Sequence, residues 1–139
     1  NKLQGQYTSG PSSIAQKAAE AAYLGEQTCV EEMRQAFERR KNLVVAMAKQ
    51  IEGLKMNNPM GAFYVFPDCK AFFGKKTPEG KTINDSSDLT MYLLETAHVA
   101  CVGGDSFGAP DCIRMSYATS DEKLKVAFER IAEALAALK

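Results

Sequence analysis

Residues 112–138 read CIRMSYATSDEKLKVAFERIAEALAAL, and this stretch decides the fold. Around Arg114, apolar and polar residues alternate, which predicts a short strand with one face on the core. From Leu124 onward, apolar residues recur at steps of three and four, which predicts an amphipathic helix, and Thr119 or Ser120 is placed to cap it. A strand followed directly by such a helix predicts a mixed α and β fold.

Glycine and proline divide the rest of the chain into segments in which the hydrophobic period switches between helical and alternating. Three short strands with helices against them predict an α+β sandwich, a small three-stranded sheet covered by helices. Upstream of the strand at 112–117, the expected elements are a turn over 6–11, a helix from a Ser13–Gln16 capping box to Gly25, a long helix over 30–51 ended by Gly53, a strand over 62–66, an exposed and mobile loop over 73–87, a helix up to residue 96 capped by Asp85 or Ser86, and a strand over 99–102.

The segment from Val30 to Ile51 has apolar residues at steps of three, four or seven, which predicts a long amphipathic helix. At a rise of 1.5 Å per residue, such a helix is roughly 35 Å long. That is long for a chain of 139 residues, and it favours a strut that joins two bodies. Its charged face, which includes Arg39 and Arg40, is expected to face water.

The composition bounds the class of protein. The chain has 139 residues with 17 Lys+Arg against 17 Asp+Glu, and 45% of its residues are hydrophobic, which fits one domain with a sizeable core. A net charge of zero gives no field to hold a polyanion, which excludes generic nucleic-acid and anionic-membrane binding. No apolar run approaches the roughly 20 residues of a spanning helix, and the first six residues lack the apolar stretch of a signal peptide. These features predict a soluble, cytoplasmic protein.

The cysteines and the single histidine do not form a recognisable site. Cys29, Cys69, Cys101 and Cys112 stand 40, 32 and 11 residues apart, without the close pairs of a zinc site, so no metal is expected. Reduced thiols are favoured over two disulfides in a chain with a core of this size. His98 has no Ser, Cys or Asp beside it in a catalytic arrangement, and it is expected at the end of a helix.

Arg114 is the most informative residue, because it faces away from the apolar side of a strand too short to carry it far from the core. A guanidinium there needs an anion, and its planar fork fits a carboxylate through two parallel hydrogen bonds. The sequence leaves two alternatives for that anion, an internal Asp or Glu or a bound ligand. The nearby segment 103–108 lacks the spacing of a phosphate loop and predicts a tight turn with Phe107 in the core.

Four blocks of the sequence, taken in order, resemble the C-terminal portion of class I aminotransferases, with the greatest likeness to those of the aspartate aminotransferase type. Together they cover the chain nearly end to end. They are QGQYTSGPSSIAQ at 4–16, PMGAFYVFP at 59–67, DSFG at 105–108 and IRMSYA at 113–118.

The resemblance implies a fold-type I enzyme that depends on pyridoxal phosphate. Residues 1–28 are then the end of a large domain that holds the cofactor, and residues 29–139 are a small domain, with the long connecting helix, that closes over the substrate. Such an enzyme transfers an amino group between an amino acid and a 2-oxo acid, and it works as a homodimer. In the family, the lysine that binds the cofactor lies upstream of the QGQ segment, so this chain is expected to contain no catalytic residue and to be inactive alone.

The resemblance also assigns roles to four residues. The arginine of the family's IRxSYA block binds the substrate's α-carboxylate and matches Arg114, and an aromatic residue that lines the cleft matches Phe63. The turn that contains Thr8 and Ser9 lies near the subunit interface in the family, which implies a contribution to cofactor binding in the neighbouring subunit.

Two alternatives to an aspartate-specific enzyme stay open. One is an aminotransferase with a different specificity, for aromatic amino acids, alanine or prephenate, because no residue of this chain is marked to bind a second, distal carboxylate. The other is a non-enzymatic α+β domain for binding or assembly.

Overall fold

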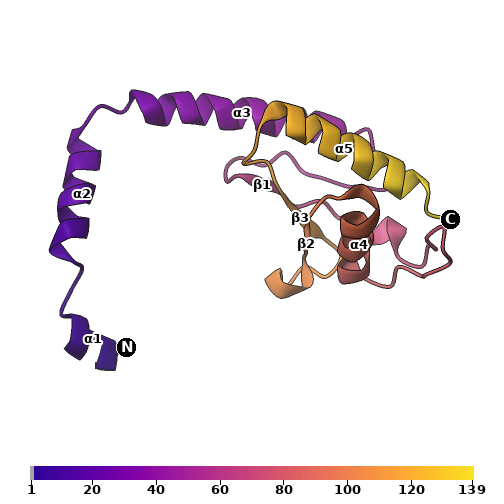
Figure 1. Cartoon of the computed structure of the whole chain (residues 1–139), viewed down its shortest axis with the longest axis horizontal. Helices are drawn as coiled ribbons and strands as arrows, with labels where there is room; N and C mark the ends of the chain where they lie inside the picture. Colours follow the sequence, from indigo (N-terminus) through magenta and orange to yellow (C-terminus); the bar gives the residue numbers. More distant parts are fainter. Residues whose placement is uncertain (1) are drawn as a thin grey trace. The chain divides into compact units, whose positions relative to one another are not determined.

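In the computed structural model, which describes residues 2–139, the chain divides into two units, Asn1–Arg34 and Gln35–Lys139. Figure 1 shows the order of their elements. The predicted domain boundary between residues 28 and 29 stays a prediction.

The first unit consists of helices that bury none of their own side chains. It contains α1 (Lys2–Thr8), α2 (Ser13–Leu24) and the beginning of α3 (Thr28–Ala48). Neither α1 nor α2 has a buried residue, and the Tyr7 and Tyr23 side chains are 86% and 87% exposed. An apolar surface of this kind is typical of helices that pack against a partner.

Two local predictions in this unit are wrong. Residues 6–8 belong to α1 and not to a turn, because the Thr8 hydroxyl donates to the Gln4 carbonyl 2.8 Å away and closes a further helical turn. The helix after it has Ser12 at its N-cap position, without a side-chain hydrogen bond, and no Ser13–Gln16 capping box forms. The Gln16 side-chain Nε2 donates instead to the Pro11 carbonyl at 2.9 Å.

The second unit is built on a three-stranded antiparallel sheet in the order β1-β3-β2. The strands are β1 (Tyr64–Val65), β2 (Val102–Gly103) and β3 (Ile113–Ser116). In the register of the sheet, Ser116 lies opposite Tyr64, and Arg114 lies opposite Val102. The α+β fold with one small sheet is therefore confirmed, although each strand is shorter than predicted.

Two helical segments and the end of α3 provide the core against this sheet. They are α4 (Ser86–Tyr92), which continues as the π-helical η2 (Leu93–Ala97), and α5 (Asp121–Ala136). The predicted caps are confirmed, since Asp85 accepts from the Asp88 amide at 2.8 Å and Ser120 accepts from the Lys123 amide at 3.4 Å. The Tyr92 hydroxyl donates to the Ala134 carbonyl 2.9 Å away and so joins the two helices inside the core.

The long helix is confirmed, but it ends at Ala48 and not at Ile51. Ile51 is buried in the turn that follows, and Gly53, in the same turn, has a φ of 95°. A Cβ atom at Gly53 would lie 2.8 Å from the Phe72 ring, so the chain bends here against an aromatic side chain.

Most residues of the segment 73–87 are exposed, as its composition predicts, but buried side chains and backbone hydrogen bonds anchor it, and its mobility stays a prediction. Ile83 is fully buried and Thr77 is 5% exposed, and Lys76 pairs with Thr82 in an isolated β-bridge. The Lys76 and Lys139 backbones also exchange hydrogen bonds of 2.7 and 3.0 Å, which fix the segment to the end of the chain. Burial of one isoleucine outweighs the polar composition around it.

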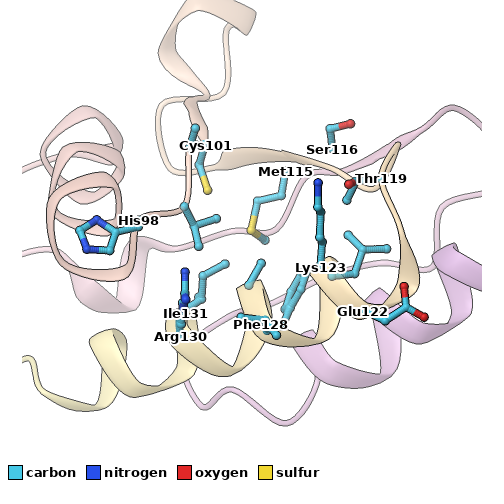
Figure 2. Close-up of a pocket in the computed structure, with 15 residues that line it drawn as sticks. His98, Cys101, Met115, Ser116, Thr119, Glu122, Lys123, Phe128, Arg130 and Ile131 are labelled. Atoms are coloured by element: carbon cyan, nitrogen blue, oxygen red, sulfur yellow. The ribbon is translucent and has the colours of Figure 1, made fainter.

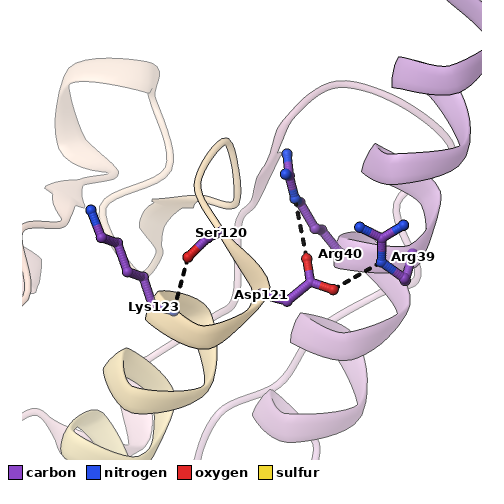
Figure 3. A network of polar contacts seen from close by, with 5 residues as sticks. All are labelled: Arg39, Arg40, Ser120, Asp121 and Lys123. Atoms are coloured by element: carbon purple, nitrogen blue, oxygen red, sulfur yellow. Dashed lines mark hydrogen bonds and ion pairs between the residues drawn. The ribbon is translucent and has the colours of Figure 1, made fainter.

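Asp121 joins the beginning of α5 to α3, which lies beside it in Figure 1. Figure 3 shows that its carboxylate accepts from the Arg39 Nε at 2.8 Å and from the Arg40 Nε at 3.3 Å. Arg39 is exposed to water as predicted, whereas Arg40 is half-buried, and both also bind the Asp121 carboxylate. The Arg39 guanidinium, through its hydrogen bond, holds the pKa of the Asp121 carboxyl below its ordinary value.

We expect the Asp121 contact to make stability depend on acidity. Because the folded pKa is lowered, the contact stabilises the fold above the unfolded-state pKa of about 3.9 and is lost as the pH falls through the folded pKa. Urea unfolding of the 139-residue chain at pH 6 and pH 3 should show a smaller acid-induced loss in Asp121→Asn than in wild type. The difference should shrink in 1 M NaCl. Equal acid losses in both proteins would contradict the contact.

All four cysteines are free thiols, and they differ in exposure. Cys29 is exposed, whereas burial raises the pKa of Cys69 to about 12 and that of Cys101 to about 11. No group of three or more metal-ligating side chains comes together within residues 2–139. Over the same residues, no helix has both the length and the apolar character needed to cross a membrane.

Thiol labelling checks this arrangement directly. In the folded 139-residue chain at pH 8, an Ellman's reagent assay should show one fast thiol, Cys29. We expect Cys69 to react slower by at least about two orders of magnitude, because a thiolate is the reactive form and burial raises the pKa of Cys69 to about 12. Cys101 and Cys112 are half-buried and burial also raises their pKa values, so both should react more slowly than Cys29. The fast phase should disappear in Cys29→Ser, and 8 M urea should expose all the thiols. A second fast thiol in the folded Cys29→Ser variant would show that the core is open.

Candidate functional site

Arg114 lies on the central strand of the sheet, on the face opposite the core. Along β3, Ile113 and Met115 are buried, while Arg114 is half-buried and Ser116 is exposed. Val102, its neighbour across β2, is 42% exposed. The sheet therefore presents Arg114 at the centre of a partly open, mainly apolar surface.

Aromatic rings hold the guanidinium of Arg114. Its Cζ atom lies 4.7 Å from the centre of the Phe107 ring and 5.4 Å from the centre of the Tyr64 ring. The Phe107 ring in turn meets Phe66 edge to face, with ring centres 6.0 Å apart and an angle of 88° between the planes. We name these three residues, Tyr64, Phe66 and Phe107, the aromatic bracket.

Within residues 2–139, no Asp or Glu forms an ion pair with Arg114. Its guanidinium lies instead over the Tyr64 and Phe107 rings of the bracket. Of the two anions that the sequence left open, an internal carboxylate is therefore not found in the part of the chain that the structure describes. A half-buried guanidinium without an anion, on a surface of low polarity, is suited to bind a carboxylate through two charge-assisted hydrogen bonds.

The glycine-rich turn after β2 places Phe107 beside Arg114. Residues Asp105–Phe107 form one 3-10 turn, η3, which Gly108 ends with a φ of 74°. The Gly104 and Ala109 amides donate to the Cys112 and Gly104 carbonyls at 2.8 and 3.0 Å. Because these amides bond within the turn, they are not available to cradle a phosphate, in agreement with the sequence prediction.

The predicted burial of Phe107 in the core is wrong, since the side chain is 49% exposed. It lies instead on the open face of the sheet, where it contacts Arg114 and Phe66. An apolar residue in a tight turn favours burial, but the sequence does not indicate on which face of the sheet its side chain lies.

Phe63 lies next to the bracket. Its ring meets that of Tyr64 edge to face, with ring centres 5.6 Å apart, and its side chain is 50% exposed. Its carbonyl accepts from the Tyr117 amide at 2.8 Å, and the Tyr117 hydroxyl donates to the Ala62 carbonyl at the same distance. The Tyr64 ring thus contacts both Phe63 and Arg114.

Thr8 and Ser9 belong to the first unit and are exposed. The Thr8 hydroxyl is engaged with the Gln4 carbonyl, and Ser9 follows the helix with a φ of 51°. Around them, neither α1 nor α2 buries a side chain, so no enclosed cavity for a cofactor is built there. Among residues 2–139, Thr8 and Ser9 therefore offer exposed side chains and no enclosing walls for pyridoxal phosphate, and their part in cofactor binding stays a prediction.

A separate cavity of about 510 Å³ lies beside α5, between this helix and the segment 98–101. Figure 2 shows the Cys101, Met115 and Phe128 side chains around it. His98 also lines it, and this residue follows η2 in a left-handed conformation with a φ of 55°, at the helix end where the sequence predicts it. The cavity does not include Arg114, and we assign it no role in binding the carboxylate.

The sequence alone does not indicate that the aromatic bracket supports Arg114. Tyr64 and Phe66 are two residues apart in the strand predicted over 62–66, which indicates that their side chains lie on the same face. The link to Arg114 depends on the pairing of β1 with β3, which a single sequence does not reveal.

Comparison with known proteins places these features in a family. Residues 1–131 match the family described as aminotransferase class I and II. An aspartate aminotransferase of Rhizobium meliloti (strain 1021) is 49% identical over 132 residues, which are 95% of this chain and 32% of that protein. A bifunctional aspartate aminotransferase and glutamate/aspartate-prephenate aminotransferase of Petunia hybrida is 46% identical over 143 residues, which cover 100% of this chain and 30% of the relative.

A solved structure shows the same fold. The crystal structure of the aspartate aminotransferase from Rhizobium meliloti superposes with a TM-score of 0.90 at 47% identity, covering 99% of this chain and 34% of that one. This chain thus spans about a third of the length of the relatives that it matches.

Proposed function

We propose, from the premise that this chain belongs to the class I and II aminotransferase family, that it is the C-terminal part of an aspartate aminotransferase-like enzyme. The whole enzyme, which we call the full-length parent, transfers an amino group between an amino acid, in the first place aspartate, and a 2-oxo acid. Residues 29–139 are the small domain that closes over the substrate, and the 139-residue chain is inactive alone.

One observation carries this proposal: Arg114 presents a half-buried guanidinium that no carboxylate of residues 2–139 neutralises. Amino acids and 2-oxo acids share a carboxylate next to the reacting carbon. Two parallel hydrogen bonds from one guanidinium fix both the position and the rotation of that carboxylate. Arg114 thereby orients the reacting carbon of either substrate in the same way.

The strand that carries Arg114 also connects it to the rest of the small domain. Seven residues after Arg114, Asp121 begins α5 and binds Arg39 and Arg40 on α3. A substrate that binds Arg114 therefore acts on a sheet and two helices that are joined by ion pairs. We propose that this body moves as one when the domain closes and excludes water from the substrate.

Pyridoxal phosphate supplies the electron sink for amino-group transfer in this family, and we place it on the part of the full-length parent outside residues 1–139. Thr8 and Ser9 are proposed to approach the cofactor of a neighbouring subunit in a homodimer. Phe63, exposed beside Tyr64, is proposed to line the substrate cleft. A cytoplasmic location goes with this metabolic role and with the composition.

A second specificity has support from the comparisons, since four relatives carry prephenate in their names beside aspartate. Prephenate, like the 2-oxo acids, has the carboxylate that Arg114 is proposed to bind. The full-length parent should therefore be assayed with aspartate as the amino-group donor and with either prephenate or another 2-oxo acid as the acceptor. A non-enzymatic binding domain instead predicts no cofactor in the full-length parent at all.

The test is a spectroscopic titration with pyridoxal phosphate. We expect the full-length parent to develop the cofactor's visible absorption band, and aspartate to change it, whereas the 139-residue chain shows neither. Absence of the band from the full-length parent would reject the enzyme and leave a binding domain.

A further inference from the structure

We propose that Phe107 is a positioning residue for Arg114, with its ring holding the guanidinium in place before a carboxylate arrives. This inference rests on the proposed function of Arg114. It assigns to Phe107, with Tyr64 and Phe66, the task that an internal carboxylate performs at many buried arginines.

The distances support this role. The Arg114 Cζ atom lies within 6 Å of both ring centres, at 4.7 Å for Phe107 and 5.4 Å for Tyr64, which is the range of a cation–π contact. An arginine side chain loses much rotamer freedom when it is fixed. Rings that order it in advance lower this cost for the incoming ligand.

The choice of rings over an anion has a chemical consequence. A carboxylate partner would occupy the N–H donors of Arg114, whereas an aromatic face attracts the cation without accepting the bidentate hydrogen bonds. The guanidinium is therefore ordered and still able to donate to a substrate carboxylate.

Phe107 is itself rigidly held. The Phe107 and Gly108 amides each donate at 2.9 Å within the turn, and the ring meets Phe66 edge to face. A Cβ atom at Gly104 would lie 2.1 Å from the Ala109 carbonyl oxygen and 2.5 Å from that of Cys112, so the turn admits only glycine there. Because the backbone of the turn is fixed in this way, we expect the ring to lie beside Arg114 before a ligand binds.

The kinetic test uses the full-length parent. In Phe107→Leu, which removes the ring and keeps an apolar side chain, we expect the KM for aspartate and for the 2-oxo acid to rise by about 3- to 30-fold, with kcat changed by less than about 3-fold. Phe107→Tyr retains an aromatic face and should restore most of the affinity. Phe73→Leu is the matched control, because Phe73 is half-buried and makes no ring contact with Arg114 among the described residues.

A second readout does not depend on activity. In the 139-residue chain, the NMR signal of the Arg114 Nε–H group, assigned with Arg114→Lys, should show an upfield ring-current shift and restricted motion. Phe107→Leu should reduce both, and Phe107→Tyr should keep them. Titration with succinate as a carboxylate probe should move the signal at lower concentration in wild type than in Phe107→Leu.

The outcomes separate this inference from the proposed function. If Arg114→Lys weakens substrate binding while Phe107→Leu leaves KM and the Arg114 signal unchanged, the positioning role is overturned and the function of Arg114 stands. If both variants bind substrates like wild type, the proposed role of Arg114 fails as well. A rise of KM in Phe107→Leu together with a KM near the wild-type value in Phe107→Tyr supports the inference.

Discussion

Replacement of Arg114 by alanine in the full-length parent should lower kcat/KM for aspartate by roughly 100- to 1,000-fold. The reason is the loss of a bidentate, charge-assisted contact in a partly desolvated site, which costs about 3–4 kcal/mol of transition-state stabilisation. The apolar setting of Arg114 in the aromatic bracket strengthens the contact relative to one in water.

Arg114→Lys provides the graded comparison for this prediction. Lysine keeps the charge but offers no planar fork, so its loss should be smaller than that of alanine and still clear. The measurement is steady-state kinetics with an amino acid and a 2-oxo acid, together with circular dichroism to confirm folding. Because both substrates carry the same carboxylate, both kcat/KM values should fall together. An alanine variant with wild-type efficiency would remove Arg114 from the site.

The sequence predicts best where burial repeats with a period. The helix from Asp121 and the strand around Arg114 are confirmed. Each buries one face regularly, so the spacing of its apolar residues predicts the type of secondary structure. The cap at Ser120 is equally local, since a side chain there meets an amide three residues on.

Predictions failed where a single distant contact decides the structure. Ile83 is fully buried within a polar segment that has no period, and Asp121 binds arginines about 80 residues away in the chain. The apolar character of Phe107 predicts a place in the core, but the sequence of its turn does not indicate on which face of the sheet the side chain lies, and it is 49% exposed. Each case depends on tertiary neighbours, which local propensity does not encode.

The sequence singles out Arg114 but does not indicate the aromatic rings around it. Arg114 stands out because a cation in an alternating strand needs an explanation, while its support by Tyr64 and Phe107 requires knowledge of which strands pair. The first unit illustrates the same limit, since residues with turn propensity at 6–8 are helical in the structure.

The second large effect concerns stability. Phe128 on α5 is 4% exposed and belongs to the hydrophobic core of the second unit. Its replacement by alanine should lower the free energy of unfolding by about 3–5 kcal/mol, because the lost transfer energy adds to the energy of the cavity that remains. For a domain of ordinary stability, about 5–15 kcal/mol, that is a large fraction of the total.

Val126→Ala on the same helix is the matched control, because Val126 is 44% exposed and its truncation should change stability by no more than about 0.5 kcal/mol. Urea unfolding of the 139-residue chain, followed by circular dichroism, should show a lower midpoint for Phe128→Ala with an unchanged slope. Equal midpoints for the two variants would mean that α5 does not pack on the sheet as described. Phe128 belongs to the same hydrophobic core as Ile113 and Met115, the neighbours of Arg114 on β3. Phe128→Ala in the full-length parent should therefore also weaken substrate binding through Arg114, and Val126→Ala should not.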